Sequence, residues 1–344
     1  MRRKRNRRQR VLACMIAVSV LFSGCQGVGK EEKKSSLRIG VSLYRADDTF
    51  INNLRSIMEE KAKEYEREKG IKVTLDIQDA KGSQNTQNSQ VERFIALECD
   101  VLCINPVDRM DASGMIDNAM TAGVPVVFFN RQPVEEDMNR WDQLYYVGVD
   151  AKETAILQGE MVVDLYRKHP EAVDLNGDGV VSYVMLEGET SHQDSLIRTE
   201  WSVQTLKDGR VPIEKITGGI ANWERSQASA LMEQWLAEYP DTIELVISNN
   251  DDMALGAIDA LERAQITGVN VIGIDGTTQG LEALKNGSLL GTVSANKELY
   301  VSAIVELAAS CALKEALPKE YPLTDQKYFW TPQEILINKI EENP

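Results

Sequence analysis

Residues 244–276 read ELVISNNDDMALGAIDALERAQITGVNVIGIDG. Two apolar runs, ELVIS and VNVIGI, flank a segment with the pattern of a helix, and this order of strand, helix and strand is the βαβ unit of a parallel sheet. Polar residues follow each run, Asn250 and Asp251 after the first and Asp275 after the second. Since the carboxyl ends of strands in an open α/β sheet face the ligand crevice, we expect a ligand at this edge.

The same rhythm of short apolar runs and helix-like segments covers most of the chain. It begins with RIGVSLY, VTLDIQ, VLCIN and VPVVFFN, and it restarts with VSYVML and VPIEKI before residue 244. We therefore predict two doubly wound α/β domains with parallel sheets. The strand-like segment YYVGVD at residues 145–150 joins the two sets of strands without a long linker, which favours a hinge.

Length and composition agree with two domains that each bury a core, because the chain has 344 residues of which 43% are hydrophobic. The formal net charge is −15 although residues 1–24 carry only basic charged residues. Such an acidic chain repels phosphate backbones, so we expect no nucleic-acid partner.

The N-terminus has the features of an export signal. A basic stretch from Arg2 to Arg10 precedes the apolar run from Val11 to Phe22, which is too short to span a bilayer and has the length of a signal-peptide core. The small residues Ser23 and Gly24 stand directly before Cys25, and the motif LFSGC resembles a bacterial lipobox, with Phe22 where Leu is usual. We expect residues 1–24 to be a signal peptide, Cys25 to carry lipid and residues 25–36 to form a polar tether. An uncleaved membrane anchor is the alternative.

Three cysteines remain beyond this signal: Cys99, Cys103 and Cys311. Cys99 and Cys103 lie in the apolar segment ALECDVLCINP, where cysteine commonly behaves as a small buried hydrophobe. A metal site at these cysteines would need further ligands, and with two histidines in the chain none stands out. We predict buried thiols.

Several spaced motifs together resemble one family. They are IGVSLYRADDTF, VPVVFFNRQP, YYVGVDAKE, DLNGDG, GETSHQDSLIRT, ISNNDDMALGAIDAL and GIDG. From Leu37 to about Asn296 the chain is similar to the periplasmic galactose/glucose-binding proteins of bacterial ABC transporters. The resemblance implies a periplasmic binding protein type I fold, with residues 37–149 plus 296–330 in one lobe and residues 150–295 plus 331–344 in the other.

A sugar offers hydroxyls that suit planar polar partners and C–H faces that suit aromatic rings. The resemblance implies a sugar site made by Asp48, Phe50, Asn130, His192, Asp194, Arg198, Trp223, Asn250 and Asp275. Phe50 and Trp223 are the implied stacking pair. Asp194 and Arg198 are four residues apart and therefore share a helix face. Without the other motifs, the simpler interpretation of this pair is an ion pair on a solvated helix surface. Asn250 and Asp251 have their own alternative as caps of the helix that starts near Met253.

One departure from the family pattern follows GTV at residues 291–293. Ala295 stands where the family has a sugar-contacting Asn, and Asn296 comes one residue later. Either the register shifts and Asn296 reaches the sugar, or one hydroxyl contact is lost.

The motif DLNGDGVVS at residues 174–182 has the opening of an EF-hand calcium loop. Asp174, Asn176 and Asp178 supply oxygens at positions 1, 3 and 5, and Gly179 stands at position 6. The backbone carbonyl of Val180 and the side chain of Ser182 occupy the next ligand positions. Position 12 is Met185, which cannot bind calcium, and the resemblance nominates Glu244 in its place. The alternative is an Asx-rich turn that needs no ion.

These observations predict a binding protein and not an enzyme. No nucleophile with a base and no glycine-rich phosphate loop stands out. Paired acids such as Asp47 and Asp48 would suit a glycosidase, but the two-domain architecture argues against one. The resemblance implies a monomer at the outer face of the cell membrane that captures a hexose by hinge closure and passes it to an ABC transporter permease. A sensor that presents bound sugar to a membrane receptor or sensor kinase is the alternative.

We predict that Cys25→Ala releases the protein from membranes, because the thiol that would carry the lipid is lost. Cell fractionation of wild type and variant measures the release. Mass spectrometry that finds the segment from Met1 to Cys25 intact in the mature protein would contradict the prediction.

Overall fold

The structure is a computed structural model that describes residues 34–338. The expected signal peptide, the acylated Cys25 and most of the tether lie outside the described residues, as do residues 339–344. Among residues 34–338 no helix combines the length and the apolar character needed to cross a membrane.

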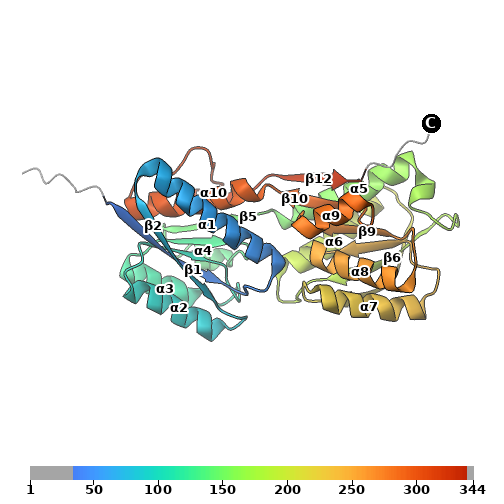
Figure 1. The fold of residues 1–344 in the computed structure, drawn as a ribbon, viewed down its shortest axis with the longest axis horizontal. Helices are drawn as coiled ribbons and strands as arrows, with labels where there is room; N and C mark the ends of the chain where they lie inside the picture. Colours follow the sequence, from blue (N-terminus) through green and yellow to red (C-terminus); the bar gives the residue numbers. More distant parts are fainter. Residues whose placement is uncertain (1–33, 339–344) are drawn as a thin grey trace, which may run out of the picture. The chain divides into compact units, whose positions relative to one another are not determined.

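The first lobe is built on a parallel sheet of six strands in the order β11-β5-β4-β3-β1-β2. Figure 1 labels β1, β2 and β5 of this sheet. Its elements are β1 (Ser36–Leu43), α1 (Thr49–Lys69), β2 (Lys72–Asp79), α2 (Gln84–Ala96), β3 (Val101–Ile104), α3 (Ser113–Ala122), β4 (Val126–Phe129), α4 (Glu135–Met138), β5 (Leu144–Gly148), α10 (Lys297–Leu313) and β11 (Tyr328–Trp330).

The second lobe repeats the arrangement, with strand order β12-β10-β9-β8-β6-β7. Its elements are α5 (Ala151–Lys168), the 3-10 helix η1 (Pro170–Ala172), β6 (Val181–Glu187), α6 (Gln193–Asp208), β7 (Ile213–Ile220), α7 (Arg225–Glu238), β8 (Leu245–Ser248), α8 (Asp251–Ala264), β9 (Asn270–Ile274), α9 (Thr278–Asn286), β10 (Gly291–Ala295) and β12 (Gln333–Ile337). Only β12 runs antiparallel to its neighbour in this sheet. The prediction of two doubly wound lobes is confirmed.

Helices cover both faces of each sheet, which explains why the central strands are continuous apolar runs. In the first lobe β3 and β4 are buried along their whole length. One face packs against α1 and α10, where Tyr300 is the largest fully buried side chain, and the other packs against α2 and α3. Cys99, Cys103 and Cys311 are buried and form no disulfide, in agreement with the predicted thiols.

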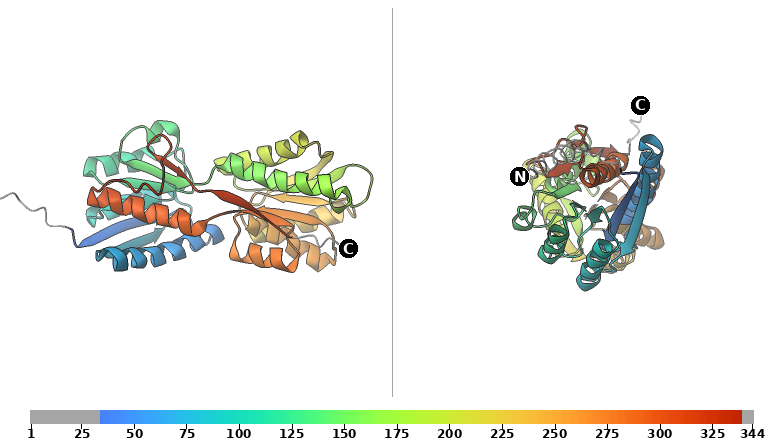
Figure 2. Two further views of the ribbon diagram at one scale, coloured as in Figure 1. Left: turned by 90° about the horizontal axis from the view of Figure 1, so that it is seen from above. Right: turned by 90° about the vertical axis from the view of Figure 1, so that its left-hand side faces the viewer.

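The chain passes between the lobes three times, after β5, after β10 and between β11 and β12 (Figure 2). Hydrogen bonds tie the first and third crossings together. The Thr331 amide donates to the Gly148 carbonyl at 2.8 Å, and the Gln333 side-chain amide donates to the Asp150 carbonyl at 3.1 Å. The crossings therefore form a short connection between the two lobes, the geometry that a hinge requires.

Candidate functional site

A small cavity lies at the carboxyl ends of strands from both sheets. Its volume is about 30 Å³. It is lined by Tyr44, Asp48, Phe50, Ile51, Asn130, His192, Asp194, Arg198, Trp223, Asn250 and Asp275. The structure thus brings together nine of the ten residues that the sequence nominated for sugar binding, and Asn296 is the exception.

In the first lobe, Asp48 and Asn130 are held by turns that follow β1 and β4. Asp48 is the N-cap of α1, where its Oδ1 accepts the Ile51 amide at 3.0 Å and its Oδ2 accepts the Tyr44 hydroxyl. Asn130 has a left-handed backbone with φ of 63°, and its amide donates to the Tyr300 hydroxyl at 2.9 Å. Phe50 meets the ring of Tyr300 edge-on, with the centroids 6.3 Å apart.

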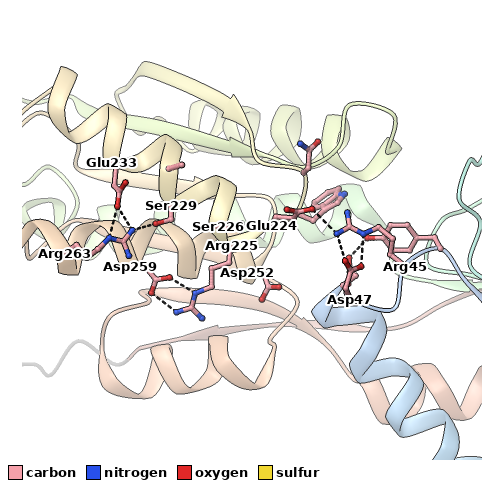
Figure 3. A pocket seen from close by; sticks show the side chains of 15 residues that line it. Arg45, Asp47, Glu224, Arg225, Ser226, Ser229, Glu233, Asp252, Asp259 and Arg263 are labelled. Atoms are coloured by element: carbon pink, nitrogen blue, oxygen red, sulfur yellow. Dashed lines mark hydrogen bonds and ion pairs between the residues drawn. The ribbon is translucent and has the colours of Figure 1, made fainter. Parts of the chain in front are cut away.

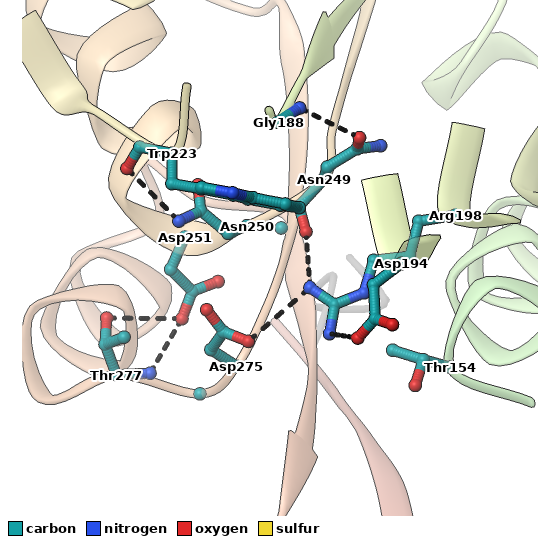
Figure 4. Close-up of polar contacts among 12 residues, drawn as sticks. Thr154, Gly188, Asp194, Arg198, Trp223, Asn249, Asn250, Asp251, Asp275 and Thr277 are labelled. Carbon is teal, nitrogen blue, oxygen red and sulfur yellow. Dashed lines mark hydrogen bonds and ion pairs between the residues drawn. The ribbon is translucent and has the colours of Figure 1, made fainter. Parts of the chain in front are cut away.

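In the second lobe, a buried guanidinium organises the polar side chains (Figure 4). Arg198 on α6 is only 6% exposed. It donates to the Asn249 carbonyl at 2.9 Å and lies 3.6 Å from Asp194 and 3.8 Å from Asp275. Burial raises the pKa of Asp194 and of Asp275, and the Arg198 charge opposes the shift in both. Such a cluster of fixed donors and acceptors suits the hydroxyls of a polyol.

Trp223 presents its indole to this cluster from a loop with a left-handed backbone. Its φ is 67°, and its carbonyl accepts the Asn250 side-chain amide at 3.3 Å. A Cβ at Gly188 would lie 2.2 Å from the indole ring, so only glycine lets the ring take this position. The indole nitrogen is buried without a hydrogen-bond partner in the part of the chain that the structure describes.

His192 packs edge-on against Trp223, with the ring centroids 5.2 Å apart. It is the N-cap of α6, where Nδ1 accepts the Asp194 amide at 3.1 Å. Burial, together with the charges of Arg131 and Arg198, lowers the pKa of His192 well below its ordinary value. The imidazole is therefore neutral near pH 7, and it can offer Nε2–H to a ligand.

Asp275 directly follows β9 and has a strained backbone, with φ of 111°. The turn after it is held by Asp251, which is fully buried and accepts the Thr277 amide and the Thr292 hydroxyl, both at 2.7 Å. Lys297 adds a bond of 2.6 Å from its ammonium to the Gly276 carbonyl. These contacts fix the direction of the Asp275 carboxylate.

Asn296 lies apart from the other residues nominated for the sugar site. Its side chain caps α10, where Oδ1 accepts the Leu299 amide at 3.0 Å, and it does not line the cavity. Ala295 is the last residue of β10 and is buried. Asn250, in contrast, both caps α8 and lines the cavity, so its two alternative roles coexist.

The predicted calcium loop precedes β6. Asp174 accepts the amides of Gly177 and Gly179, both at 2.9 Å, so its carboxylate closes the turn. Glu244, which is 3% exposed, accepts the amides of Leu175 at 2.7 Å and Ser182 at 2.8 Å. Between residues 34 and 338 no group of three His, Cys, Asp or Glu side chains is arranged to hold a metal ion.

A wider groove of about 740 Å³ adjoins the cavity and shares Tyr44, Asp48 and Trp223 with it (Figure 3). Its arginines form ion pairs: Arg45 with Asp47 and Glu224, Arg225 with Asp259, and Arg263 with Glu233. Arg45 lowers the pKa of Asp47. A glycosidase needs an acid whose pKa is raised, so Asp47 does not suit that role.

Sequence reasoning missed Tyr44 and Ile51, which also line the cavity. Both flank Asp48 within the motif IGVSLYRADDTF, and that proximity was the only available signal. Behind Tyr44 lie Arg131 and Glu189, whose ion pair joins the lobes.

The chain belongs to the periplasmic binding protein domain family, whose model matches residues 39–316. It is 32% identical to the D-galactose/methyl-galactoside binding periplasmic protein MglB of Haemophilus influenzae, over 86% of this chain and 87% of the relative. It is 30% identical to a xylitol-binding protein of Mycolicibacterium smegmatis, over 92% and 82% of the two chains.

Among solved structures it resembles an ABC transporter solute binding protein of Bacillus halodurans with bound myo-inositol. The TM-score is 0.73 and the identity 29%, over 90% of this chain and 96% of that one. Members of this family are substrate-binding proteins and not enzymes, and they act outside the cytoplasm.

We predict that Asp251→Asn flattens the pH dependence of stability. Burial raises the pKa of Asp251 to about 6, from an ordinary 3.8. A carboxyl whose folded-state pKa is raised stabilises the fold most below its unfolded pKa, and this contribution is lost as the pH rises through the folded pKa. Between about pH 3 and pH 7 the wild type should lose about 3 kcal/mol relative to the variant.

Urea unfolding at several pH values measures this difference. Asp259→Asn is the matched control, because Arg225 lowers the pKa of Asp259 and the sign of its contribution is reversed. Parallel pH profiles for the wild type and Asp251→Asn would contradict the prediction.

Proposed function

We propose that the protein captures a hexose by closing its two lobes and delivers it to the permease of an ABC importer. The main support for this proposal is that carboxylate, amide, guanidinium and aromatic groups from both lobes line one cavity. Asp48, Asn130 and Phe50 come from the first lobe, and Arg198 and Trp223 are among those from the second. A ligand that touches both sets favours the closed arrangement over the open one.

The chemistry of the lining favours a sugar. Asp194, Asp275 and Arg198 offer acceptors and donors that can each meet two neighbouring hydroxyls, while Phe50 and Trp223 offer apolar ring faces. MglB is named for D-galactose and methyl-galactoside, whereas other relatives are named for xylitol or hold myo-inositol. The hexose is proposed because MglB, which is named for D-galactose, is 32% identical to this chain over 86% of its length.

The cavity is far smaller than typical small-molecule pockets of roughly 300–1,000 Å³. A sugar must therefore enter while the lobes are apart, and bending at the three crossings provides that motion. Attachment through a lipid on Cys25 would keep the protein beside its membrane partner. The sensor alternative uses the same closed form and differs only in the partner that recognises it.

We predict that Trp223→Ala weakens hexose binding by about 2 kcal/mol or more, as for a central aromatic contact in an interface. Calorimetry with glucose, galactose, ribose, xylose, arabinose, xylitol and myo-inositol measures the loss and identifies the ligand class. Trp201→Ala is the matched control. Trp201 is on α6, where its ring packs against the Lys152 ammonium, and it does not line the cavity. An unchanged dissociation constant in Trp223→Ala, or wild-type binding of pentoses alone, would contradict the proposal.

We also propose that the loop at residues 174–182 binds calcium. Asp174, Asn176 and Asp178 offer the hard oxygens that calcium prefers. The support from the structure is that Glu244, more than sixty residues away in sequence, is buried against this loop through the Leu175 and Ser182 amides. With calcium bound, the carboxylate oxygens of Asp174 and Glu244 would turn from the backbone amides toward the ion. The ion would then join the loop to the start of β8.

We predict that calcium raises the melting temperature relative to chelator in protein that starts metal-free. Binding to the folded state alone stabilises it by about 2.7 kcal/mol when free calcium is a hundred times its dissociation constant. Glu244→Gln should remove most of the calcium-dependent shift, whereas Glu233→Gln, exposed beside Arg263, should keep it. Equal melting of the wild type in calcium and in chelator would rule the site out.

A further inference from the structure

A buried ion pair joins the two lobes directly beside the sugar site. Arg131 follows Asn130 in the first lobe, and Glu189 stands three residues before His192 in the second. The Arg131 Nη2 and the Glu189 Oε2 lie 2.8 Å apart. Arg131 is 6% exposed and the Glu189 side chain 20%, so solvent screens this pair poorly.

Arg131 also touches the network that holds Asp48. Its guanidinium carbon lies 3.8 Å from the centroid of the Tyr44 ring, within the range of a cation–π contact. The hydroxyl of Tyr44 donates to Asp48, and Arg131 Nη1 donates to the Val107 carbonyl at 2.8 Å. One guanidinium therefore contacts the other lobe through Glu189 and the sugar site through Tyr44.

The charge of Arg131 depends on Glu189 for its compensation. Its Nε is buried and has no hydrogen-bond partner among residues 34–338. When one partner of such a pair is removed, the other is left desolvated and unpaired, which costs much more than losing an exposed pair. Separation of the lobes would break the pair and let water reach both groups.

We propose that Arg131 and Glu189 form an ionic latch that holds the lobes closed over the ligand, and that Arg131 is a positioning residue for Asp48 through Tyr44. The inference rests on the proposed function for the identity of the ligand. The latch forms only after the lobes have closed. It should therefore slow the dissociation of the sugar and leave the association rate unchanged.

A second ion pair between the lobes provides a matched control. Arg45 and Glu224 lie 3.0 Å apart, but their side chains are 24% and 35% exposed, and Arg45 is also paired with Asp47. Because this pair is more accessible to solvent than Arg131 and Glu189, we expect it to contribute less to binding and stability. The two glutamates thus differ in burial while both bridge the lobes.

The test is stopped-flow measurement of hexose association and dissociation rates for Glu189→Gln, Arg131→Met, the double variant and Glu224→Gln. We expect Glu189→Gln to raise the dissociation rate at least about tenfold, with the association rate nearly unchanged, and Glu224→Gln to change neither. The double variant should be no worse than Arg131→Met, because both changes break one interaction. Arg131→Lys, which keeps the charge, should restore part of the loss.

Equal dissociation rates in Glu189→Gln and Glu224→Gln, or additive effects in the double variant, would overturn the latch. Repeating these rate measurements with whichever ligand of the calorimetric series the wild type binds separates this result from failure of the proposed function. The latch predicts faster dissociation of that ligand from Glu189→Gln than from Glu224→Gln, whatever the ligand is. Equal dissociation rates would overturn the latch, whereas a wild type that binds another ligand of the series but no hexose contradicts only the proposed function.

Discussion

In a parallel sheet every strand ends at the same edge, and this constraint governs where the polar residues of the protein lie. Asp48 and Asn130 follow strands of the first sheet, and Asn250 and Asp275 follow strands of the second. None of the four lies near another of them in sequence, yet all line one cavity. The strands themselves are buried on both faces, so their carboxyl ends are the places where the chain can expose polar side chains without disrupting a core.

Two buried arginines position the polar side chains around the cavity. Arg198 and Arg131 are each about as buried as a core residue, and each is surrounded by oxygen atoms. Arg198 takes its partners from within the second lobe, whereas Arg131 takes Glu189 from across the lobes. The partners of Arg198 all belong to one lobe, whereas the pair of Arg131 and Glu189 exists only when the two lobes meet. One cation organises the site and the other responds to its closure.

The sequence predicted a feature correctly where the residues that form it lie close together in one segment. The apolar runs predicted most of the strands, and the four-residue spacing of Asp194 and Arg198 predicted their shared helix face. It was a poor guide to β11 and β12, which are only three and five residues long and have no helix between them. It also missed Tyr44, Arg131 and Glu189, because their roles depend on neighbours from distant segments. Asn296 was nominated from its place in the sequence after GTV. Its side chain instead caps α10 by accepting the Leu299 amide.

The order of segments along the chain bears on how the protein is made. Tyr300 and the rest of α10 fill one face of the first lobe, and β11 completes its sheet, so that lobe lacks part of its core until more than three hundred residues have been synthesised. The second lobe likewise receives its edge strand β12 last. Neither lobe can fold to completion as a nascent N-terminal fragment, since contacts of such long sequence separation form late and slowly. A chain with this connectivity stays incompletely folded throughout translation, which is the condition that export of an unfolded polypeptide through a narrow translocation channel demands.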